Sequence, residues 1–259
     1  MKLRVLGCAG SESPGRKSPA FLIDDVLLLD GGIIGNVLTQ SAQERIDFVL
    51  LTHAHHDHIR GLPSFADNLA VSGKKESMTI IGSEATLQTL KDHLFNGLIW
   101  PDFSRIPEPS EPIVHWQEIT PQIGCMVGGY MVTAVPVNHS VPTLAYRIQK
   151  DGTSLLYTGD MGPTPALWDA IGTPTALIIE VSFPNHLEWL AIKTGHMTAN
   201  LLRQELALLP TLPAQIFISH IKPFYEKEIH QEIAALGIPG LSILHDGQEI
   251  LLSAGESSP

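Results

Sequence analysis

Short apolar runs alternate with amphipathic stretches along the whole chain. Apolar or alternating runs bounded by Gly, Pro, Asn or Asp predict strands, whereas apolar positions three or four residues apart predict helices. Strands are expected at 2–7, 20–32 (a meander), 47–51, 78–82, 113–119, 129–139, 143–150, 154–160, 176–183 and 215–220, with a closing hairpin at 241–252. Helices are expected at 33–42, 58–69, 84–95, 199–209 and 224–236. Strands and helices in both halves indicate an α/β fold, a sandwich of sheets flanked by helices.

Local signals refine three of these elements. Ser83 and Thr198 precede amphipathic stretches and are predicted to cap them, because a hydroxyl oxygen accepts from free N–H groups of a first helical turn. Asp151-Gly152 lies between two alternating runs and predicts a tight hairpin turn. The segment 96–112 carries four prolines, and we expect a loop that forms a rim around a site.

The composition is that of a globular protein, and we expect one domain over residues 1–259. The net charge is −11, from 16 basic and 27 acidic residues without a basic run. A large nucleic-acid partner is therefore not expected, whereas a small anionic substrate stays open. No run of about eighteen apolar residues predicts a membrane span. Cys8 and Cys125 are too few for a disulfide framework, which favours a reduced, cytoplasmic protein.

The sequence HAHHDH at 53–58 places four histidines and an aspartate directly after the buried strand predicted at 47–51. Side chains at the carboxyl end of a strand point into a crevice, where sheet proteins usually place their sites. Imidazole and carboxylate groups together suit Zn²⁺ and neighbouring metals, and one catalytic metal needs about three protein ligands. Five candidate ligands exceed that number, so two metals are expected, with further ligands from elsewhere in the chain.

Three later strands each end in a residue that can bind a metal: His139, Asp160 and His220. Because each follows an apolar run in the same way as the first block, we expect these side chains to converge with it. His56 should point away from its neighbours along the loop and is not expected to be a ligand. Five further histidines have no matching motif and are expected to be surface or packing residues: His93, His115, His186, His230 and His245.

The set His53, His55, Asp57, His58, His139, Asp160 and His220 resembles the binuclear site of the metallo-β-lactamase superfamily, in that family's order and over nearly the whole chain. The resemblance implies an αβ/βα sandwich of two mixed sheets and two divalent metal ions, with Zn²⁺ expected and Mn²⁺ or Fe²⁺ left open. It implies that His53, His55 and His139 hold one metal, that Asp57, His58 and His220 hold the other, and that Asp160 bridges both. Asp30 matches a position that orients a ligand histidine; a simple turn aspartate is the alternative.

Three departures from the patterns of other branches of the superfamily each argue against one of those branches. Redox members usually carry a glutamate where this chain has His55, and several β-lactamases carry a cysteine where it has Asp160. Nucleases with a large inserted domain have a longer segment between the bridging aspartate and the last histidine than the 60 residues from 160 to 220.

The segment from Glu180 to GHMT at 195–198 is similar to the class II cyclic-nucleotide phosphodiesterases and to the tRNase Z-like branch. The resemblance implies that Glu180 and His196 act beside the metals, with Asp57 as the third catalytic residue. A carboxylate that holds an imidazole raises its basicity, which suits a general acid. SFPN before GHMT, and IKP after His220, are similar to the phosphodiesterase class alone, and they suggest Asn185 and Lys222 as substrate contacts.

These features predict a binuclear-metal hydrolase of a small phosphodiester, with a 3′,5′-cyclic nucleotide, cAMP or cGMP, cleaved to the 5′-monophosphate. The alternatives are a tRNase Z-like RNA 3′-processing endonuclease, a lactone or thioester hydrolase, and a non-catalytic metal-containing binding protein. Between 59 and 138 there are five Lys and Arg against eight Asp and Glu, too few positive charges for several RNA phosphate contacts. A homodimer is open, but nothing in the sequence locates an interface.

Overall fold

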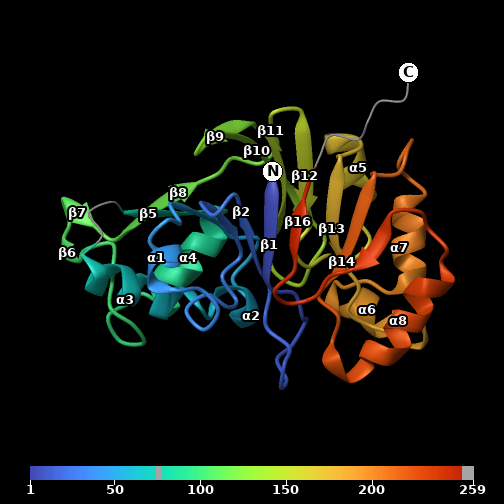
Figure 1. The fold of residues 1–259 in the computed structure, drawn as a ribbon, viewed down its shortest axis with the longest axis horizontal. Coiled ribbons are helices and arrows are strands. Elements are labelled where there is room, and N and C mark those ends of the chain that lie inside the picture. The colour runs from blue at the N-terminus through green and yellow to red at the C-terminus, as the bar shows by residue number, and fades with distance from the viewer. Residues whose placement is uncertain (74–76, 253–259) are drawn as a thin grey trace.

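Two seven-stranded sheets lie face to face in the computed structural model, which describes residues 1–73 and 77–252 (Figure 1). The first sheet has the order β16-β1-β2-β3-β4-β5-β8. Its strands are β1 (Lys2–Gly7), β2 (Ala20–Ile23), β3 (Leu27–Leu29), β4 (Phe48–Leu50), β5 (Met78–Gly82), β8 (Val114–Glu118) and β16 (Glu249–Leu251). The β3–β4, β4–β5 and β5–β8 pairs are parallel and the others antiparallel, so this sheet is mixed.

The second sheet is built from the later part of the chain, in the order β15-β14-β13-β12-β11-β10-β9. Its strands are β9 (Cys125–Val127), β10 (Tyr130–Val137), β11 (Thr143–Lys150), β12 (Thr153–Tyr157), β13 (Ala176–Glu180), β14 (Gln215–Ser219) and β15 (Leu241–Ile243). The pairs from β12 to β15 are parallel and those from β9 to β12 antiparallel. The predicted sandwich of two mixed sheets is confirmed.

Helices cover the outer face of each sheet (Figure 1). The first sheet carries α1 (Gln40–Gln43), α2 (His56–Ile59), α3 (Leu62–Ser72) and α4 (Glu84–His93). The second carries α5 (Pro165–Ile171), α6 (Glu188–Thr194), α7 (Ala199–Leu206) and α8 (Glu226–Ala235), with 3₁₀ turns η1 (Asn185–Leu187) and η2 (Pro223–Tyr225). Among the helices of the described ranges, none is both long and apolar enough to cross a membrane.

The alternation of side chains along each strand divides the core into three layers. In β3, Leu27 and Leu29 pack between the sheets, whereas Leu28 packs under the helices of the first sheet. In β13, Ile178 lies between the sheets and Ile179 under α5–α8. Because such strands are buried on both faces, they read as continuous apolar runs, and each buried Leu or Ile contributes about 1.5–3 kcal/mol of hydrophobic stabilisation.

Several local predictions are confirmed. The Ser83 hydroxyl accepts from the N–H of Thr86 at the start of α4, and the Thr198 hydroxyl accepts from the N–H of Leu201 at the start of α7. Asp151 and Gly152 both have positive φ, 48° and 74°, as a type I′ turn between β11 and β12 requires.

Two predicted elements are wrong, and a third prediction lacks support. Residues 33–42 are helical only from Gln40, because Ile33 and Ile34 are buried in the core as part of an irregular segment. The hairpin at 241–252 does not form: β15 pairs with β14 in the second sheet and β16 with β1 in the first. The loop 96–112 contains the short β6–β7 pair (Pro107–Glu108, Glu111–Pro112) and hydrogen-bonds to β8 at the edge of the first sheet, contacts that do not support a rim around the site.

Candidate metal centre

Four strands end at one edge of the sandwich, and polar side chains follow each end. His53 comes three residues after β4, His139 two after β10, Asp160 three after β12, and His220 directly after β14. Since β10, β12 and β14 run in the same direction, their carboxyl ends share one edge of the second sheet. The start of α2 brings in His55, Asp57 and His58 from the first sheet.

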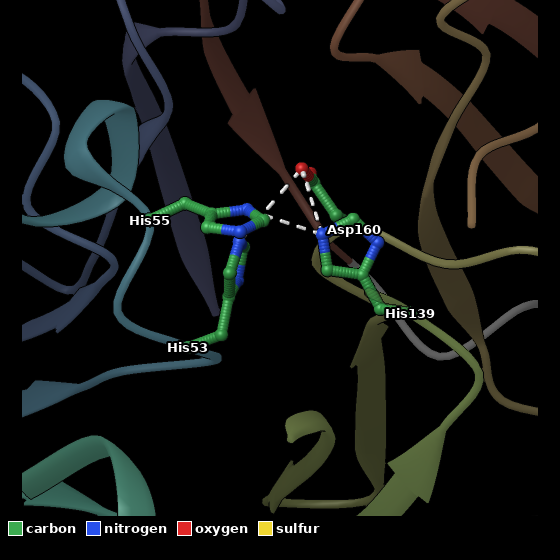
Figure 2. Close-up of side chains that lie close together, drawn as sticks. All are labelled: His53, His55, His139 and Asp160. Atoms are coloured by element: carbon green, nitrogen blue, oxygen red, sulfur yellow. Dashed lines mark hydrogen bonds and ion pairs between the residues drawn. The ribbon is translucent and has the colours of Figure 1, made fainter. Parts of the chain in front are cut away.

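All seven predicted ligands lie together. Their ligand atoms form two groups, each within 4.8 Å: His53, His55, His139 and Asp160 in one, and Asp57, His58 and His220 in the other. Figure 2 shows the imidazoles of the first group turned toward one another and toward the Asp160 carboxylate. These are the two sets that the resemblance assigns to separate metals.

Asp160 lies between the two groups. Its Oδ1 is 3.2 Å from Nε2 of His58 and 3.2 Å from Nε2 of His220. Its Oδ2 is 3.9 Å from Nε2 of His53 and of His139. One oxygen therefore faces each group, as a bridging carboxylate requires.

Contacts on the far side of the rings fix which nitrogen faces the centre. His139 donates from Nδ1 to the carbonyl oxygen of Gly195 at 2.7 Å, and His58 donates from Nδ1 to Asp30 Oδ2 at 2.7 Å. Because Nδ1 is engaged in each of these contacts, Nε2 is the nitrogen that faces the centre, and its lone pair can bind a cation when the ring is neutral. Ligand histidines in metalloproteins are held in the same way.

Several of the inward-facing atoms lack a hydrogen-bond partner among the residues that the structure describes. Nε2 of His53, Nε2 of His58 and Oδ1 of Asp160 are buried without a hydrogen bond. Buried polar atoms are nearly always paired, so three unpaired atoms aimed at one space indicate a missing cationic partner. The residues therefore fit a divalent metal.

The electrostatics favour the protonation states that coordination needs. Burial lowers the pKa of His53 well below its ordinary value and also lowers the pKa of His55 and His139. Burial opposes ionisation of Asp160, but His220 and His58 outweigh it and hold the pKa of Asp160 well below its ordinary value. His58 is the exception, because Asp160 and Asp30 outweigh burial and raise its pKa, so that a cation would displace its proton. Negative charge at the centre thus attracts whatever cation is available.

Asp30 is hydrogen-bonded to both ligand groups, directly to His58 and through the Thr52 hydroxyl to His53. It is fully buried and accepts from the N–H of Thr52 at 2.8 Å, from the hydroxyl of Tyr157 at 2.7 Å, and from His58. The Thr52 hydroxyl also donates to Asp30, so its oxygen can accept from Nδ1 of His53 at 2.9 Å. Asp30 makes the histidine contact that the resemblance implies.

Glu180 and His196 form a pair beside the second group. Glu180 is fully buried, and its Oε1 is 2.8 Å from Nδ1 of His196. The His196 ring stacks on His220 with centroids 5.5 Å apart and lies 5.1 Å from the ring of His139. Burial would lower the pKa of His196, but the Glu180 carboxylate outweighs it and raises that pKa. A ring nitrogen of His196 also lies within 4.8 Å of ligand atoms of Asp160 and His220, so a ligand role is the competing assignment.

Ser182 is a polar residue of this site that the sequence reasoning missed. Its buried hydroxyl donates to Glu180 Oε2, and the same oxygen is 2.8 Å from Nδ1 of His220. The single hydroxyl proton goes to the carboxylate, so the oxygen accepts from His220 and turns Nε2 of that ring inward. Its spacing of two residues from Glu180 at a strand end was the signal available.

The two predicted substrate contacts lie differently. Lys222 donates from Nζ to the carbonyl of Gly10 at 3.2 Å and lies 5.3 Å over the ring of Phe183, next to His196. Asn185 accepts from the N–H of Asn200 at 2.8 Å and thereby joins η1 to α7. Both roles stay predictions. His56, which we did not expect to be a ligand, is exposed and belongs to neither group.

Comparisons with known proteins agree with this geometry. Residues 26–221 match the model of the Beta-lactamase superfamily domain. A Yersinia pestis protein named probable 3′,5′-cyclic-nucleotide phosphodiesterase is 27% identical in an alignment that covers 83% of this chain and 68% of that protein. A ribonuclease Z of Pyrobaculum calidifontis is 25% identical in an alignment that covers 92% of this chain and 93% of its own. The metallo-beta-lactamase fold protein YhfI from Bacillus subtilis superposes with a TM-score of 0.77 at 19% identity, over 96% of this chain and 98% of its own. The resemblance that the motifs predict is confirmed.

Removing one inward-facing imidazole should remove a metal. His58→Ala is expected to lower the metal content of the reconstituted protein from two ions per chain to one or none, as measured by elemental analysis. His56→Ala, which removes an exposed imidazole from the same helix, serves as the matched control and should keep both. Two ions bound by the His58 variant would contradict the assignment.

Ser182→Ala should weaken metal binding without touching a ligand. Loss of the hydroxyl frees the His220 ring, and such outer contacts are worth about 10–100-fold in metal affinity. Competition with a chromogenic chelator measures the effect. Ser154 is another buried serine; it lies on β12 and accepts from the N–H of Thr175. Ser154→Ala should leave the metal affinity unchanged. Equal affinities in the two variants would show that Ser182 does not position His220.

Proposed function

Because the chain belongs to the beta-lactamase superfamily, we propose that it is a binuclear-metal hydrolase whose substrate is a small phosphodiester, a 3′,5′-cyclic nucleotide converted to the 5′-monophosphate. The observation that carries this proposal is the pair of Glu180 and His196, held 2.8 Å apart against the ligand histidines. The relative named as a cyclic-nucleotide phosphodiesterase supports the reaction class. We take residues 1–259 as one catalytic domain, of which 74–76 and 253–259 lie outside the described residues. Its free thiols, Cys8 and Cys125, suit a cytoplasmic location.

The seven clustered residues would hold two divalent cations, with Zn²⁺ as the first choice and Mn²⁺ or Fe²⁺ as alternatives, since nitrogen and oxygen donors suit all three. When bound, such cations make water a better nucleophile and stabilise negative charge on the phosphoryl oxygens. Asp57 is the more exposed carboxylate of the set, with 32% of its side chain accessible against 3% for Asp160. Asp57 is therefore placed to orient the attacking water as well.

His196 has the geometry of a general acid. Glu180 engages Nδ1, which leaves Nε2 as the nitrogen that can give a proton away. As the bond from the water oxygen to phosphorus forms, the water gives up a proton to solvent on the exposed side of the site, beside Asp57. The bond from phosphorus to the 3′-oxygen breaks, and the proton from Nε2 of His196 goes to the departing oxygen. Glu180 accepts from Nδ1 of His196 and stabilises the imidazolium before transfer.

RNA 3′-end processing is the second candidate. The ribonuclease Z of Pyrobaculum calidifontis matches over 93% of its length, and this observation favours it. The charge balance opposes it, because several phosphate contacts require clustered cations and this chain has a net charge of −11. A lactone or thioester hydrolase, or a non-catalytic binding protein, would have less need for a buried carboxylate behind His196.

One panel tests these candidates. The metal-loaded protein is assayed on cAMP, cGMP, bis(p-nitrophenyl) phosphate, a 3′-extended tRNA precursor, a lactone and a thioester. Hydrolysis of the cyclic nucleotides ahead of the tRNA precursor is expected. Faster cleavage of the tRNA precursor would transfer the proposal to RNA processing, and two bound metals without turnover of any substrate would favour a binding protein.

His196→Ala should separate chemistry from metal retention. We expect two bound metals and a loss of about 10²–10⁴-fold in kcat on cyclic nucleotides, the usual contribution of a general acid. Aryl phosphodiesters, whose leaving group needs no proton, should lose much less. His186→Ala is the matched control, because His186 pairs with Glu228 at 2.9 Å on the exposed surface. Loss of a metal in the His196 variant would make this residue a ligand, and equal losses on both substrates would refute the acid role.

A further inference from the structure

A surface cleft lies between the N-terminal loop and the segment that follows Ile221, and its lining lies outside the two ligand groups. It has a volume of about 530 Å³, within the range of small-molecule sites. The residues that line it are Ser11, Glu12, Ser13, Lys222, Pro223, Phe224 and Tyr225. One wall is thus the N-terminal loop and the other is η2.

The two walls of the cleft are joined close to His220, where Gly10 contacts the segment 220–222. The N–H of Gly10 donates to the carbonyl of Ile221 at 3.0 Å, and Lys222 donates to the carbonyl of Gly10 at 3.2 Å. Gly10 packs so closely that a Cβ at its position would lie 2.3 Å from the carbonyl oxygen of His220. Phe224 follows His220 by four residues, so its Cα lies at most about 14 Å away along the chain. One nucleotide can therefore reach from the ligand groups into the cleft.

Phe224 is an unusual residue on this surface. Its exposed fraction is 90%, whereas the other seven phenylalanines are buried or half-buried. Its ring meets that of Tyr225 edge to face at 5.0 Å, and Tyr225 contacts Phe183 at 6.2 Å. Phe183 in turn contacts His196 at 5.7 Å. A row of aromatic rings thus leads from the proposed general acid to an uncovered ring at the outer wall.

The charges of the cleft suit a phosphate at its inner end. Lys222 lies over the ring of Phe183, which contacts both His196 and Tyr225. The carboxylate of Glu12, the acidic group of this lining, is paired with Arg60 from the end of α2. Within residues 1–73 and 77–252, the ammonium of Lys222 donates to one carbonyl oxygen, that of Gly10, and keeps two further donors for an anion.

We propose that this cleft is the subsite for the aromatic group of the substrate, a nucleobase that stacks on Phe224 while Lys222 lies beside the phosphate. The inference rests on the proposed function, which leaves the position of the base open. Stacking on an aromatic side chain tolerates any base, since every base has a π-face. The cleft thus selects a nucleotide over a phosphodiester without a ring, and it does so without a preference between adenine and guanine.

The test measures binding of two products that differ only in the base. Calorimetric titration of the metal-loaded protein with AMP and with ribose 5-phosphate should show tighter binding of AMP. Phe224→Ala should weaken AMP by about 5- to 150-fold, the usual effect of removing a stacking partner. Ribose 5-phosphate should bind both proteins equally, and Phe224→Trp should keep the affinity for AMP. Leu98→Ala, which alters a side chain of equal exposure on the distant loop 96–112, should change neither ligand.

Two results would overturn the subsite: equal affinity of the natural protein for both ligands, or a Phe224→Ala variant that weakens both alike. Hydrolysis of cyclic nucleotides and of bis(p-nitrophenyl) phosphate by the natural protein is measured in parallel. Selective loss of AMP binding without any hydrolysis would reject the proposed function and retain the subsite. Hydrolysis of cyclic nucleotides together with AMP binding that does not depend on Phe224 would retain the proposed function and reject the subsite.

Discussion

The buried carboxylate of Asp160, at the seam between the two sheets, is the constraint on which the rest of the structure depends. Burial of an unpaired charge costs several kcal/mol, and this side chain is 3% accessible. Its oxygens face the Nε2 atoms of four histidines at 3.2–3.9 Å, yet burial keeps two of these rings, His53 and His139, neutral. Neutral imidazoles solvate an anion poorly because their inward atoms are lone pairs. Cations that accept those lone pairs resolve the conflict, and the buried network around Asp30 holds the rings in that orientation.

The sandwich is what brings these groups to one place. Strands β4, β10, β12 and β14 end at one edge of the sandwich, and the polar residues that follow them converge between the two sheets. Asp30 and His220 have φ values of 54° and 60°, a region that non-glycine residues rarely adopt. Their surroundings enforce these turns: the carbonyl of Cys8 accepts from the N–H of His220 at 2.7 Å, and the carbonyl of Leu50 accepts from the N–H of Asp30 at 2.9 Å. Local strain of about 1–3 kcal/mol per residue is the cost of aiming both side chains inward.

The sequence predicted what depends on local pattern and on position after a strand. Periodicity located the core strands, and the rule that sites follow strand ends brought His139, Asp160 and His220 together with the HAHHDH block. The sequence pattern did not predict features that depend on pairing between distant segments of the chain. The run 241–252 has the pattern of a hairpin, but whether a strand pairs with its neighbour or with β1 is decided by packing of the whole chain. Residues 33–42 carry helical spacing, yet Ile33 and Ile34 serve a core that only the assembled sheet defines. Ser182 was missed because one hydroxyl becomes informative only when its three partners are known.

The Ser182 hydroxyl links the candidate metal ligand His220 to the candidate general acid His196 through Glu180. The proton of Ser182 goes to Glu180, its lone pair receives the N–H of His220, and the other oxygen of Glu180 holds His196. One buried carboxylate therefore orients both a candidate ligand and the candidate acid, and the two rings stack at an angle of 18°. Glu180 thus couples the positions of the two rings. His220 also packs against Gly10, so the base subsite proposed at Phe224 would rest on the same backbone as the candidate ligand. A substrate small enough to span from His220 to η2 would contact every part of this unit, whereas a large polyanion would need a positive surface beyond it that the net charge of −11 does not favour.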